Sequence, residues 1–328
     1  MRLLVTGGAG FIGSNFVRHV LQTTDDVHVT NLDALTYAGN LASLHDVADD
    51  PRHRFVHGDV CDAGLVDALT GQADAVVHFA AETHVDRSID GPEVFLRTNV
   101  VGAGVVFDAA RRHGLERVLH VSTDEVYGSI EVGAFTEGDP LAPNSPYAVS
   151  KASADLLARA YAVTYDFPIT VTRTSNNFGP YQYPEKLIPL FVTNLLDGRR
   201  VPLYGDGRNV RDWTHVADNA AALWLVLTRG RRGEVYNVGA GNELSNRELT
   251  RRVLAHLDAG EDRIEHVPDR PGHDLRYAID SSRVRALGWR PARSFDEALA
   301  ETIHWYRHNE AWWRPLKQAG ASRRRGHG

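Results

Sequence analysis

An α/β fold with a doubly wound parallel sheet is predicted by three features of this 328-residue sequence. Short apolar stretches alternate with amphipathic ones through the first half of the chain, a pattern typical of strands wrapped by helices. A glycine-rich turn lies between the first apolar stretch and the first amphipathic one. Several apolar stretches lead into polar or glycine-containing segments, and in an open α/β sheet those strand ends lie at the edge where ligands bind.

The first half of the chain contains six expected strands, at residues 2–6, 27–32, 54–57, 75–79, 118–122 and 169–173. Helices are expected between them at residues 13–23 and 94–113. Beyond residue 173, loops rich in aromatic residues, prolines and glycines separate shorter elements. These are helices at residues 187–196, 218–228, 247–257 and 296–310 and a strand at residues 235–238.

Two interleaved domains are expected from this change of pattern. Residues 1–175, with returning segments at about 209–240, would form a Rossmann-type dinucleotide-binding domain. Residues 176–208 and 241–328 would form a smaller C-terminal substrate-binding domain.

The composition favours an ordinary globular protein of the cytoplasm. The formal net charge is −6 and 43% of the residues are hydrophobic, so neither nucleic acid nor a membrane surface is an expected partner. Cys61 is the single cysteine, which fits a reducing compartment. We expect no signal peptide, because the first residues run straight into the glycine-rich turn, and we expect the basic tail at residues 323–325 to be frayed.

The glycine-rich turn reads Thr-Gly-Gly-Ala-Gly-Phe-Ile-Gly, with glycines at Gly7, Gly10 and Gly13. Glycine lets the backbone approach a pyrophosphate, whose charge then meets the N-terminus of the following helix. Asp33 ends the second expected strand at about the spacing of an acid that binds the ribose. A carboxylate there would repel a 2′-phosphate, so NAD is favoured over NADP. The alternative is a structural turn followed by a surface aspartate.

Two further segments of the predicted domain have cofactor and structural interpretations. Asp59 follows the third expected strand, where its side chain could contact adenine, and it could equally cap a helix at residues 63–69. The segment that leaves the fourth strand contains Ala80 and Ala81, whose small side chains suit a place where the backbone passes close to a cofactor. No metal site is expected, because the 16 histidines are scattered without ligand spacing.

Tyr147 and Lys151 are four residues apart, about one helical turn, so both side chains would lie on one face of a helix. A lysine ammonium beside a phenol lowers the pKa of that phenol, and Tyr147 could then act as a base near neutral pH.

Thr123, Asp124 and Glu125 directly follow the fifth expected strand, at the sheet edge where a substrate would lie. A tyrosine base together with two adjacent carboxyl groups is more than a hydride transfer requires. The combination indicates a reaction that also breaks C–H and C–O bonds. Taken alone, the two carboxyl groups are also compatible with a polar loop that supplies caps and solvated charges.

Polar side chains in the later part of the chain could bind a sugar and a diphosphate. The amides of Asn176 and Asn177 lie at the edge where a sugar is expected. Guanidinium and ammonium groups match phosphate oxygens, and the candidates are Lys186, Arg211, Arg270 and Arg276. Each of these cations by itself is also compatible with a solvated surface charge.

Four motifs together resemble the extended short-chain dehydrogenase/reductase family of nucleotide-sugar enzymes, and within it the dTDP-glucose 4,6-dehydratases. The motifs are Asp-Ala-Leu-Thr-Tyr-Ala-Gly-Asn at 33–40, Thr-Asp-Glu-Val-Tyr-Gly at 123–128, Asn-Asn at 176–177 and Arg-Pro-Gly-His-Asp at 270–274. The resemblance extends from Gly7 to about Leu316. Related epimerases are similar in the glycine turn and the Tyr-Lys pair but usually lack the Asp-Glu pair. Thr83 departs from the family, which commonly has serine at that position.

The resemblance implies NAD-dependent dehydration of dTDP-glucose to dTDP-4-keto-6-deoxyglucose. Tyr147, beside Lys151, would take the proton of the C4 hydroxyl, to which Thr123 also hydrogen-bonds. Glu125 would remove the C5 proton, and a protonated Asp124 would donate to the departing C6 hydroxyl. The remaining expectation is a homodimer formed through the helices at residues 94–113 and 150–165.

The same resemblance implies two sets of binding residues. The cofactor set is Gly7, Gly10, Phe11, Ile12, Gly13, Asp33, Leu35, Thr36, Asp59, Val60, Phe79, Ala80, Ala81, Thr98, Tyr147, Lys151 and Asn177. The substrate set is Thr83, Thr123, Asn176, Lys186, Leu187, Pro202, Tyr204, Arg211, Asn246, Arg270, His273, Arg276 and Tyr277. The alternatives are a nucleotide-sugar 4-epimerase or decarboxylase of the same superfamily and a binding protein that retains the fold without turnover.

Overall fold

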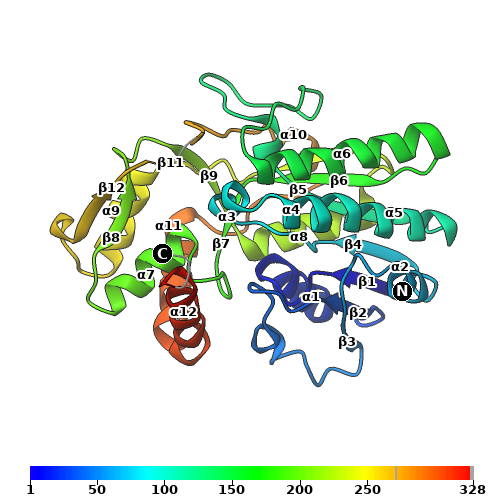
Figure 1. The fold of residues 1–328 in the computed structure, drawn as a ribbon, viewed down its shortest axis with the longest axis horizontal. Coiled ribbons are helices and arrows are strands. Elements are labelled where there is room, and N and C mark those ends of the chain that lie inside the picture. The colour runs from blue at the N-terminus through cyan, green and yellow to red at the C-terminus, as the bar shows by residue number, and fades with distance from the viewer. Residues whose placement is uncertain (270–271, 326–328) are drawn as a thin grey trace.

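The computed structural model describes residues 1–269 and 272–325, and its larger part is built around a seven-stranded sheet (Figure 1). The strands are β1 (Arg2–Thr6), β2 (His28–Asp33), β3 (His53–His57), β4 (Ala75–His78), β5 (Arg117–Thr123), β6 (Thr170–Thr174) and β10 (Val235–Val238). Their spatial order is β10-β6-β5-β4-β1-β2-β3, and every pairing is parallel. The predicted fold class is confirmed.

Helices cover both faces of this sheet, as the buried strands require. One face is covered by α1 (Phe11–Thr23), α8 (Val216–Arg229) and α10 (Ser282–Ala286), and the other by α2 (Ala63–Thr70), α5 (Ala103–Arg112) and α6 (Pro146–Tyr165). Successive strand side chains alternate between the faces. In β1, Leu3 and Val5 therefore belong to the core that contains Phe16, whereas Leu4 belongs to the core that contains Phe107.

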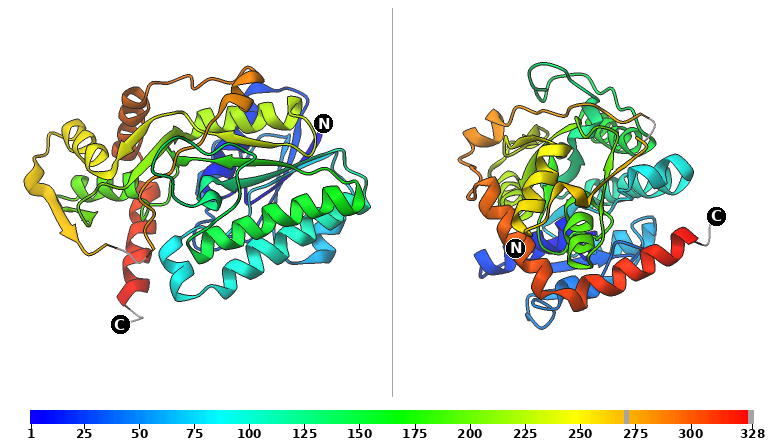
Figure 2. Two further views of the ribbon diagram at one scale, coloured as in Figure 1. Left: turned by 90° about the horizontal axis from the view of Figure 1, so that it is seen from above. Right: turned by 90° about the vertical axis from the view of Figure 1, so that its left-hand side faces the viewer.

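The smaller part has its own sheets and its own core (Figure 2). Its strands are β7 (Asn176–Phe178), β8 (Val201–Tyr204), β9 (Val210–His215), β11 (Glu243–Ser245) and β12 (Ile264–Val267). Its helices are α7 (Leu187–Leu196), α9 (Asn246–His256), α11 (Phe295–His308) and α12 (Glu310–Arg325). The core of this part contains Phe178, Phe191, Trp213 and Tyr306.

The helix expected at residues 94–113 is instead three segments. α4 (Glu93–Phe95) leads into the π-helix η2 (Leu96–Gly102), and α5 follows. Asn99 in η2 is buried and its side chain exchanges hydrogen bonds with the backbone of Glu82, at 2.8 and 3.0 Å, and donates to Ser150 Oγ at 2.8 Å. This tertiary contact occurs at the wider helical turn and leaves no trace in the apolar pattern.

Three other expectations differ from the structure. The helix expected at residues 296–310 is interrupted at Asn309, between α11 and α12. The basic tail expected to be frayed is helical as far as Arg325. The short strands β7, β8, β9, β11 and β12 were not expected, because each pairs with a segment distant in sequence. Within the described ranges, no helix is long and apolar enough to cross a membrane.

Candidate active site

A cavity of about 310 Å³ opens at the carboxyl edge of the large sheet. It lies where the strand order reverses between β1 and β4, so the chain leaves these neighbouring strands in opposite directions. Its lining comes from the segments after β1, β2, β3, β4, β5 and β6, together with Thr98 of η2, the start of α6 and residues up to Lys186.

The glycine turn forms one wall of the cavity, and its glycines are needed for packing. A Cβ on Gly7, whose φ is 74°, would lie 2.5 Å from the backbone nitrogen of Ala80, and a Cβ on Gly13 would lie 2.3 Å from the carbonyl oxygen of Gly7. Gly10 precedes α1 without a side-chain cap, so the first N–H groups of this 13-residue helix have no side-chain acceptor among the residues that the structure describes. A pyrophosphate fits such a helix start.

Asp33 connects the glycine turn to the loop that follows β2. Its carboxylate accepts hydrogen bonds from the N–H of Ala9 at 2.9 Å and from the N–H of Leu35 at 2.8 Å. Burial raises the pKa of Asp33, and the two N–H donors oppose that change. Asp33 and Thr36 line the cavity, whereas the side chain of Leu35 packs against the hydrophobic core.

Asp59 lines the cavity but does not cap the helix that follows it. The N-cap of α2 is Asp62, whose Oδ1 accepts from the N–H of Leu65 at 3.0 Å. The capping interpretation of Asp59 is therefore wrong, because the helix begins at Ala63 and the cap must immediately precede it. Asp59 Oδ1 instead accepts from the N–H of Cys61 at 2.9 Å.

Tyr147 and Lys151 lie in the first turns of α6, and both are buried in the cavity wall. Ser145 caps this helix by accepting from the N–H of Ala148 at 3.1 Å, and Pro146 occupies its first turn. The N–H of Tyr147 donates to Ser88 Oγ at 3.1 Å. These contacts fix the start of α6, so the two side chains have defined positions.

The electrostatics of this pair differ from the expectation. The Lys151 ammonium donates to the carbonyl oxygen of Val121 at 2.7 Å, and burial lowers the pKa of Lys151 to about 8. Burial raises the pKa of Tyr147 well above its ordinary value, and Glu125 raises it further, against a hydrogen bond with Thr123. The expectation of a lowered pKa for Tyr147 is therefore wrong for this structure, because burial and neighbouring carboxyl groups dominate.

The two adjacent carboxyl groups lie on a tight turn at the end of β5. Asp124 and Glu125 begin the 3₁₀ helix η3 (Asp124–Tyr127), and Thr123 caps it. Asp124 is 2% exposed, and its Oδ2 has no hydrogen-bond partner among the described residues. Burial raises the pKa of Asp124 well above its ordinary value, with Glu125 and Asp212 adding to the effect. Burial therefore favours the protonated form of Asp124, which can donate a proton.

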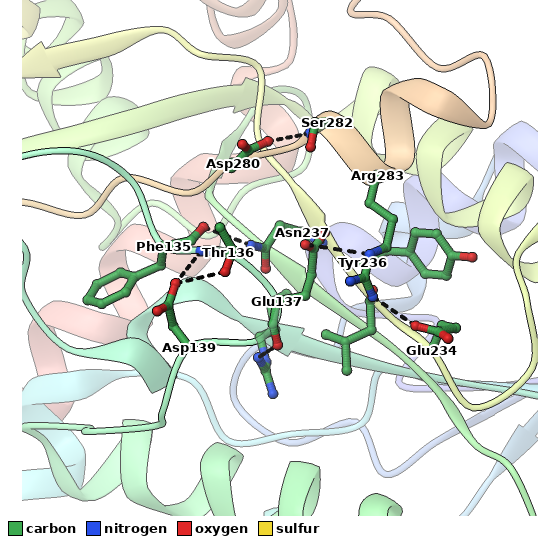
Figure 3. Close-up of polar contacts among 12 residues, drawn as sticks. Phe135, Thr136, Glu137, Asp139, Glu234, Tyr236, Asn237, Asp280, Ser282 and Arg283 are labelled. Carbon is green, nitrogen blue, oxygen red and sulfur yellow. Dashed lines mark hydrogen bonds and ion pairs between the residues drawn. The ribbon is translucent and has the colours of Figure 1, made fainter.

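A buried hydrogen-bond network supports the turn that carries Asp124 and Glu125. Arg173 donates to the Tyr127 hydroxyl at 2.7 Å, and that hydroxyl donates to Asn237 Oδ1 at 2.8 Å. Asn237 also donates from Nδ2 to the carbonyl oxygen of Phe135 at 3.1 Å and from its backbone N–H to Glu137 Oε1 at 3.0 Å (Figure 3). The carboxyl pair therefore stands on a braced turn rather than on a free loop.

Four residues of the expected substrate set line the cavity, namely Thr83, Thr123, Asn176 and Lys186. Lys186 Nζ donates to the carbonyl oxygen of Thr83 at 3.1 Å. Within the described part of the chain, the side-chain oxygens of Asn176 and Asn177 are buried without a hydrogen-bond partner, as is Ser122 Oγ. Buried polar atoms usually have partners, and these three atoms are available to a ligand or water in the cavity.

The other members of the substrate set lie outside this lining, and Arg270 lies outside the described residues. They are Leu187, Pro202, Tyr204, Arg211, Asn246, His273, Arg276 and Tyr277. Arg276 pairs with Glu243 at 2.8 Å, and Arg211 donates to the carbonyl oxygens of Val210 and Asp274. Arg211 and Arg276 are thus held by protein groups in this structure, whereas Lys186 lines the cavity.

The cavity also contains residues that the sequence did not single out, including Tyr37, Glu82, Gln182, Tyr183 and Glu185. Tyr37 is part of the 33–40 motif, so that motif was the available signal. Gln182 and Tyr183 belong to the aromatic and proline-rich loop after Gly179. Glu82 and Glu185 carry no sequence pattern that points to a site.

Comparisons with known proteins agree with this geometry. The family model described as GDP-mannose 4,6 dehydratase matches residues 4–302. A dTDP-glucose 4,6-dehydratase from Streptomyces niveus is 56% identical, and the match covers 97% of this chain and 96% of that protein. The crystal structure of DesIV, a dTDP-glucose 4,6-dehydratase from Streptomyces venezuelae with NAD and TYD bound, is 57% identical with a TM-score of 0.94, covering 96% of this chain and 100% of that one.

A solved UDP-glucose 4-epimerase is less similar. The structure from Thermus thermophilus, in complex with NAD, is 31% identical with a TM-score of 0.86, and the match covers 94% of this chain and 100% of that one.

Proposed function

The chain belongs to the GDP-mannose 4,6 dehydratase family, and from this premise we propose that it converts dTDP-glucose to dTDP-4-keto-6-deoxyglucose with NAD as its cofactor. The observation that carries the proposal is the carboxyl pair at the end of β5. A buried Asp124, whose raised pKa favours its protonated form, lies next to Glu125 in the cavity that also contains Tyr147 and Lys151. An acid and a base side by side are what the elimination of water requires.

The comparisons support dehydration over epimerisation. Relatives named dTDP-glucose 4,6-dehydratase are 52–58% identical over nearly the whole chain, whereas the Thermus UDP-glucose 4-epimerase is 31% identical. The Asp-Glu pair lies in the described cavity, where an epimerase has no elimination step for it to serve.

The cavity residues fit NAD. The glycine turn has no room for a Cβ, the start of α1 is uncapped, and Asp33 is positioned for ribose hydroxyls. When bound, NAD supplies the acceptor and later the donor of the hydride, and the positive charge of its oxidised ring lowers the pKa of a nearby phenol.

The side chains then have the following roles. Tyr147 takes the proton of the C4 hydroxyl, and Thr123, which is hydrogen-bonded to Tyr147, contacts the same oxygen. A ketone at C4 acidifies the C5 proton, which Glu125 removes. Asp124 donates its proton to the C6 hydroxyl, and water leaves. C6 then receives the hydride and C5 is reprotonated, which gives the 4-keto-6-deoxy product. Because the pKa of Asp124 is raised, the protonated acid persists to a higher pH than an ordinary aspartic acid does, and it is lost as the pH rises through that pKa.

We propose that residues 1–175, with segments near 209–240, bind the cofactor, and that residues 176–208 and 241–328 bind the nucleotide-sugar. The core shared by α7, α9 and α11 supports a separate substrate-binding unit. The single cysteine fits a reducing compartment, and a cytoplasmic location is part of the proposal.

A homodimer is also part of the proposal, because two neighbouring helical segments expose apolar side chains. Val101 at the end of η2 is 57% exposed, and on α6 Leu156 is 56% and Val163 is 73% exposed. These segments lie side by side on one face of the sheet (Figure 1). Apolar side chains gathered on adjacent helices are typical of a surface that another chain covers.

The reaction itself is tested by incubating the protein and NAD with dTDP-glucose. We expect a product lighter than the substrate by the mass of one water molecule. A 4-epimerase would leave the mass unchanged, and a binding protein would leave the substrate unaltered. If neither dTDP-glucose nor UDP-glucose loses water, the proposed function is wrong.

Glu125→Gln removes the proposed base for the C5 proton. Oxidation at C4 should continue while elimination slows by about 100-fold or more, so the absorbance of bound reduced cofactor should rise during turnover. Glu131→Gln is the matched control, because Glu131 is exposed on the loop beyond η3. Normal dehydration by Glu125→Gln would show that another group removes the C5 proton.

Asp124→Asn removes the proposed acid and should slow dehydration of dTDP-glucose by about 100-fold. A substrate with fluoride at C6 has a better leaving group, so its elimination should be largely spared. The measurement is the ratio of the two rates in the variant and in the parent protein. An equal loss with both substrates would contradict the role of Asp124 as the acid.

Sedimentation at micromolar concentration should give a mass twice the 36.2 kDa of one chain. A charge at the exposed helical surface, in Leu156→Glu with Val101→Glu, should yield the monomer because a buried unpaired charge opposes association. Val132→Glu is the control, since Val132 is 87% exposed on the loop between η3 and α6 and belongs to neither helical segment. A monomeric parent protein would refute the proposed dimer.

A further inference from the structure

Asp274 is a buried carboxylate on which side chains from separate segments converge. Its side chain accepts hydrogen bonds from Asn144 Nδ2 at 2.6 Å and from the Tyr277 hydroxyl at 2.6 Å. Its carbonyl oxygen accepts from Arg211 at 2.9 Å and from Asn209 Nδ2 at 3.2 Å. The residue is 9% exposed, and none of the roles assigned above uses it.

The contact with Asn144 joins Asp274 to the helix that carries Tyr147. Asn144 immediately precedes Ser145, the N-cap of α6. The same side chain lies against the end of the carboxyl-bearing turn, because a Cβ on Gly128 would be 3.4 Å from Asn144 Nδ2. Asp274 therefore bonds to a point where the start of α6 and the end of η3 meet.

The other contacts of Asp274 reach two side chains beside the carboxyl pair. The Arg211 guanidinium stacks on the Tyr277 ring, with 4.1 Å between its Cζ and the ring centroid. Burial is the main reason why the pKa of Tyr277 is raised, and the charge of Glu125 is the next. Arg211 acts in the opposite sense on Asp124, whose pKa it lowers. Tyr277 is thus close enough to Glu125, and Arg211 close enough to Asp124, for these pairs to interact electrostatically.

The segment that begins at Asp274 continues as a strap along the loop beyond η3. Ile130 N–H donates to the Arg276 carbonyl at 3.1 Å, Phe135 N–H to the Ala278 carbonyl at 2.9 Å, and Asp280 N–H to the Phe135 carbonyl at 2.8 Å. Figure 3 shows Phe135 and Asp280 at the far end of this strap. At its near end, Asp274 is the strap's side-chain link to α6.

We propose that Asp274 is a positioning residue, which ties the start of α6 to the strap at residues 274–280 and so holds Tyr277 and Arg211 beside Asp124 and Glu125. The proposal rests on the proposed function and deepens it. A carboxylate accepts from both Asn144 and Tyr277, which a single amide oxygen at this position does not. Loss of Asp274 removes a hydrogen-bond partner from Tyr277 and from the start of α6. The rate of elimination then falls more than the rate of oxidation at C4, because Tyr277 and Arg211 lie beside the carboxyl pair.

Asp274→Ala tests the proposal with dTDP-glucose and the NAD-loaded protein. We expect kcat to fall by about 10- to 100-fold, as for a small misplacement of catalytic groups, with a smaller change in KM. Reduced cofactor should accumulate during turnover, since elimination becomes slow relative to oxidation. Asp274→Asn should be intermediate, and Asn144→Ala combined with Asp274→Ala should be less impaired than the product of the two single effects, because both remove the same link.

The control is a carboxylate on the surface of the smaller part, measured in the same way. Asp296→Ala removes an exposed carboxylate that pairs with Arg252 at 2.7 Å, and it should leave kcat unchanged. An unchanged kcat in Asp274→Ala, or a loss of kcat without accumulation of reduced cofactor, would overturn the proposal. If Asp274→Ala does not fold, Tyr277→Phe deletes one of the two donors, keeps the ring, and should accumulate reduced cofactor. Failure of the parent protein to dehydrate dTDP-glucose would instead overturn the proposed function.

Discussion

The close contact between the glycine turn after β1 and the segment after β4 is the constraint on which the site depends. The backbone of Ala80 lies where a Cβ of Gly7 would be, so the two segments can approach only without that side chain. Thr6 Oγ1 reinforces the contact, since it hydrogen-bonds to His78 Nδ1 at 2.7 Å and accepts from the N–H of Ala80. Because β1 and β4 are neighbours at the reversal of strand order, this junction opens the crevice at the carboxyl edge.

Burial at that edge then determines which groups carry protons. Asp124 and Glu125 are equal in type but not in surroundings, because Asp124 is buried, with one oxygen unpartnered among the described residues, while Glu125 is partly exposed. The difference makes one carboxyl group an acid. The same environment holds the phenol of Tyr147 protonated, so activation of this base depends on what binds beside it. A cavity that is polar, buried and only partly satisfied is suited to a ligand that completes it.

Much of the fold and a large part of the site could be predicted from the sequence. The apolar alternation located all six strands of the first half to within one or two residues. The glycine spacing located the turn that forms one wall of the cavity. Most errors arose where a distant partner decides the outcome. The π-helix at Asn99 depends on a hydrogen bond to Glu82, and Glu185 and Asp274 acquire their places through contacts with segments many residues away. The cap of α2 is a local exception, because Asp62 rather than Asp59 immediately precedes the helix.

The sequence by itself determined the chemistry that is available: a glycine turn, an acid for ribose, a Tyr-Lys pair one helical turn apart, and two adjacent carboxyl groups after a strand. Residue type and short spacing are local properties, and they suffice for such groups. The tertiary structure alone decided which carboxyl group is buried and favours its protonated form, why the phenol is protonated, and which side chains brace the catalytic turn. Burial, electric fields and long-range hydrogen bonds arise only when distant segments pack together, because a pKa responds to everything nearby in space rather than in sequence.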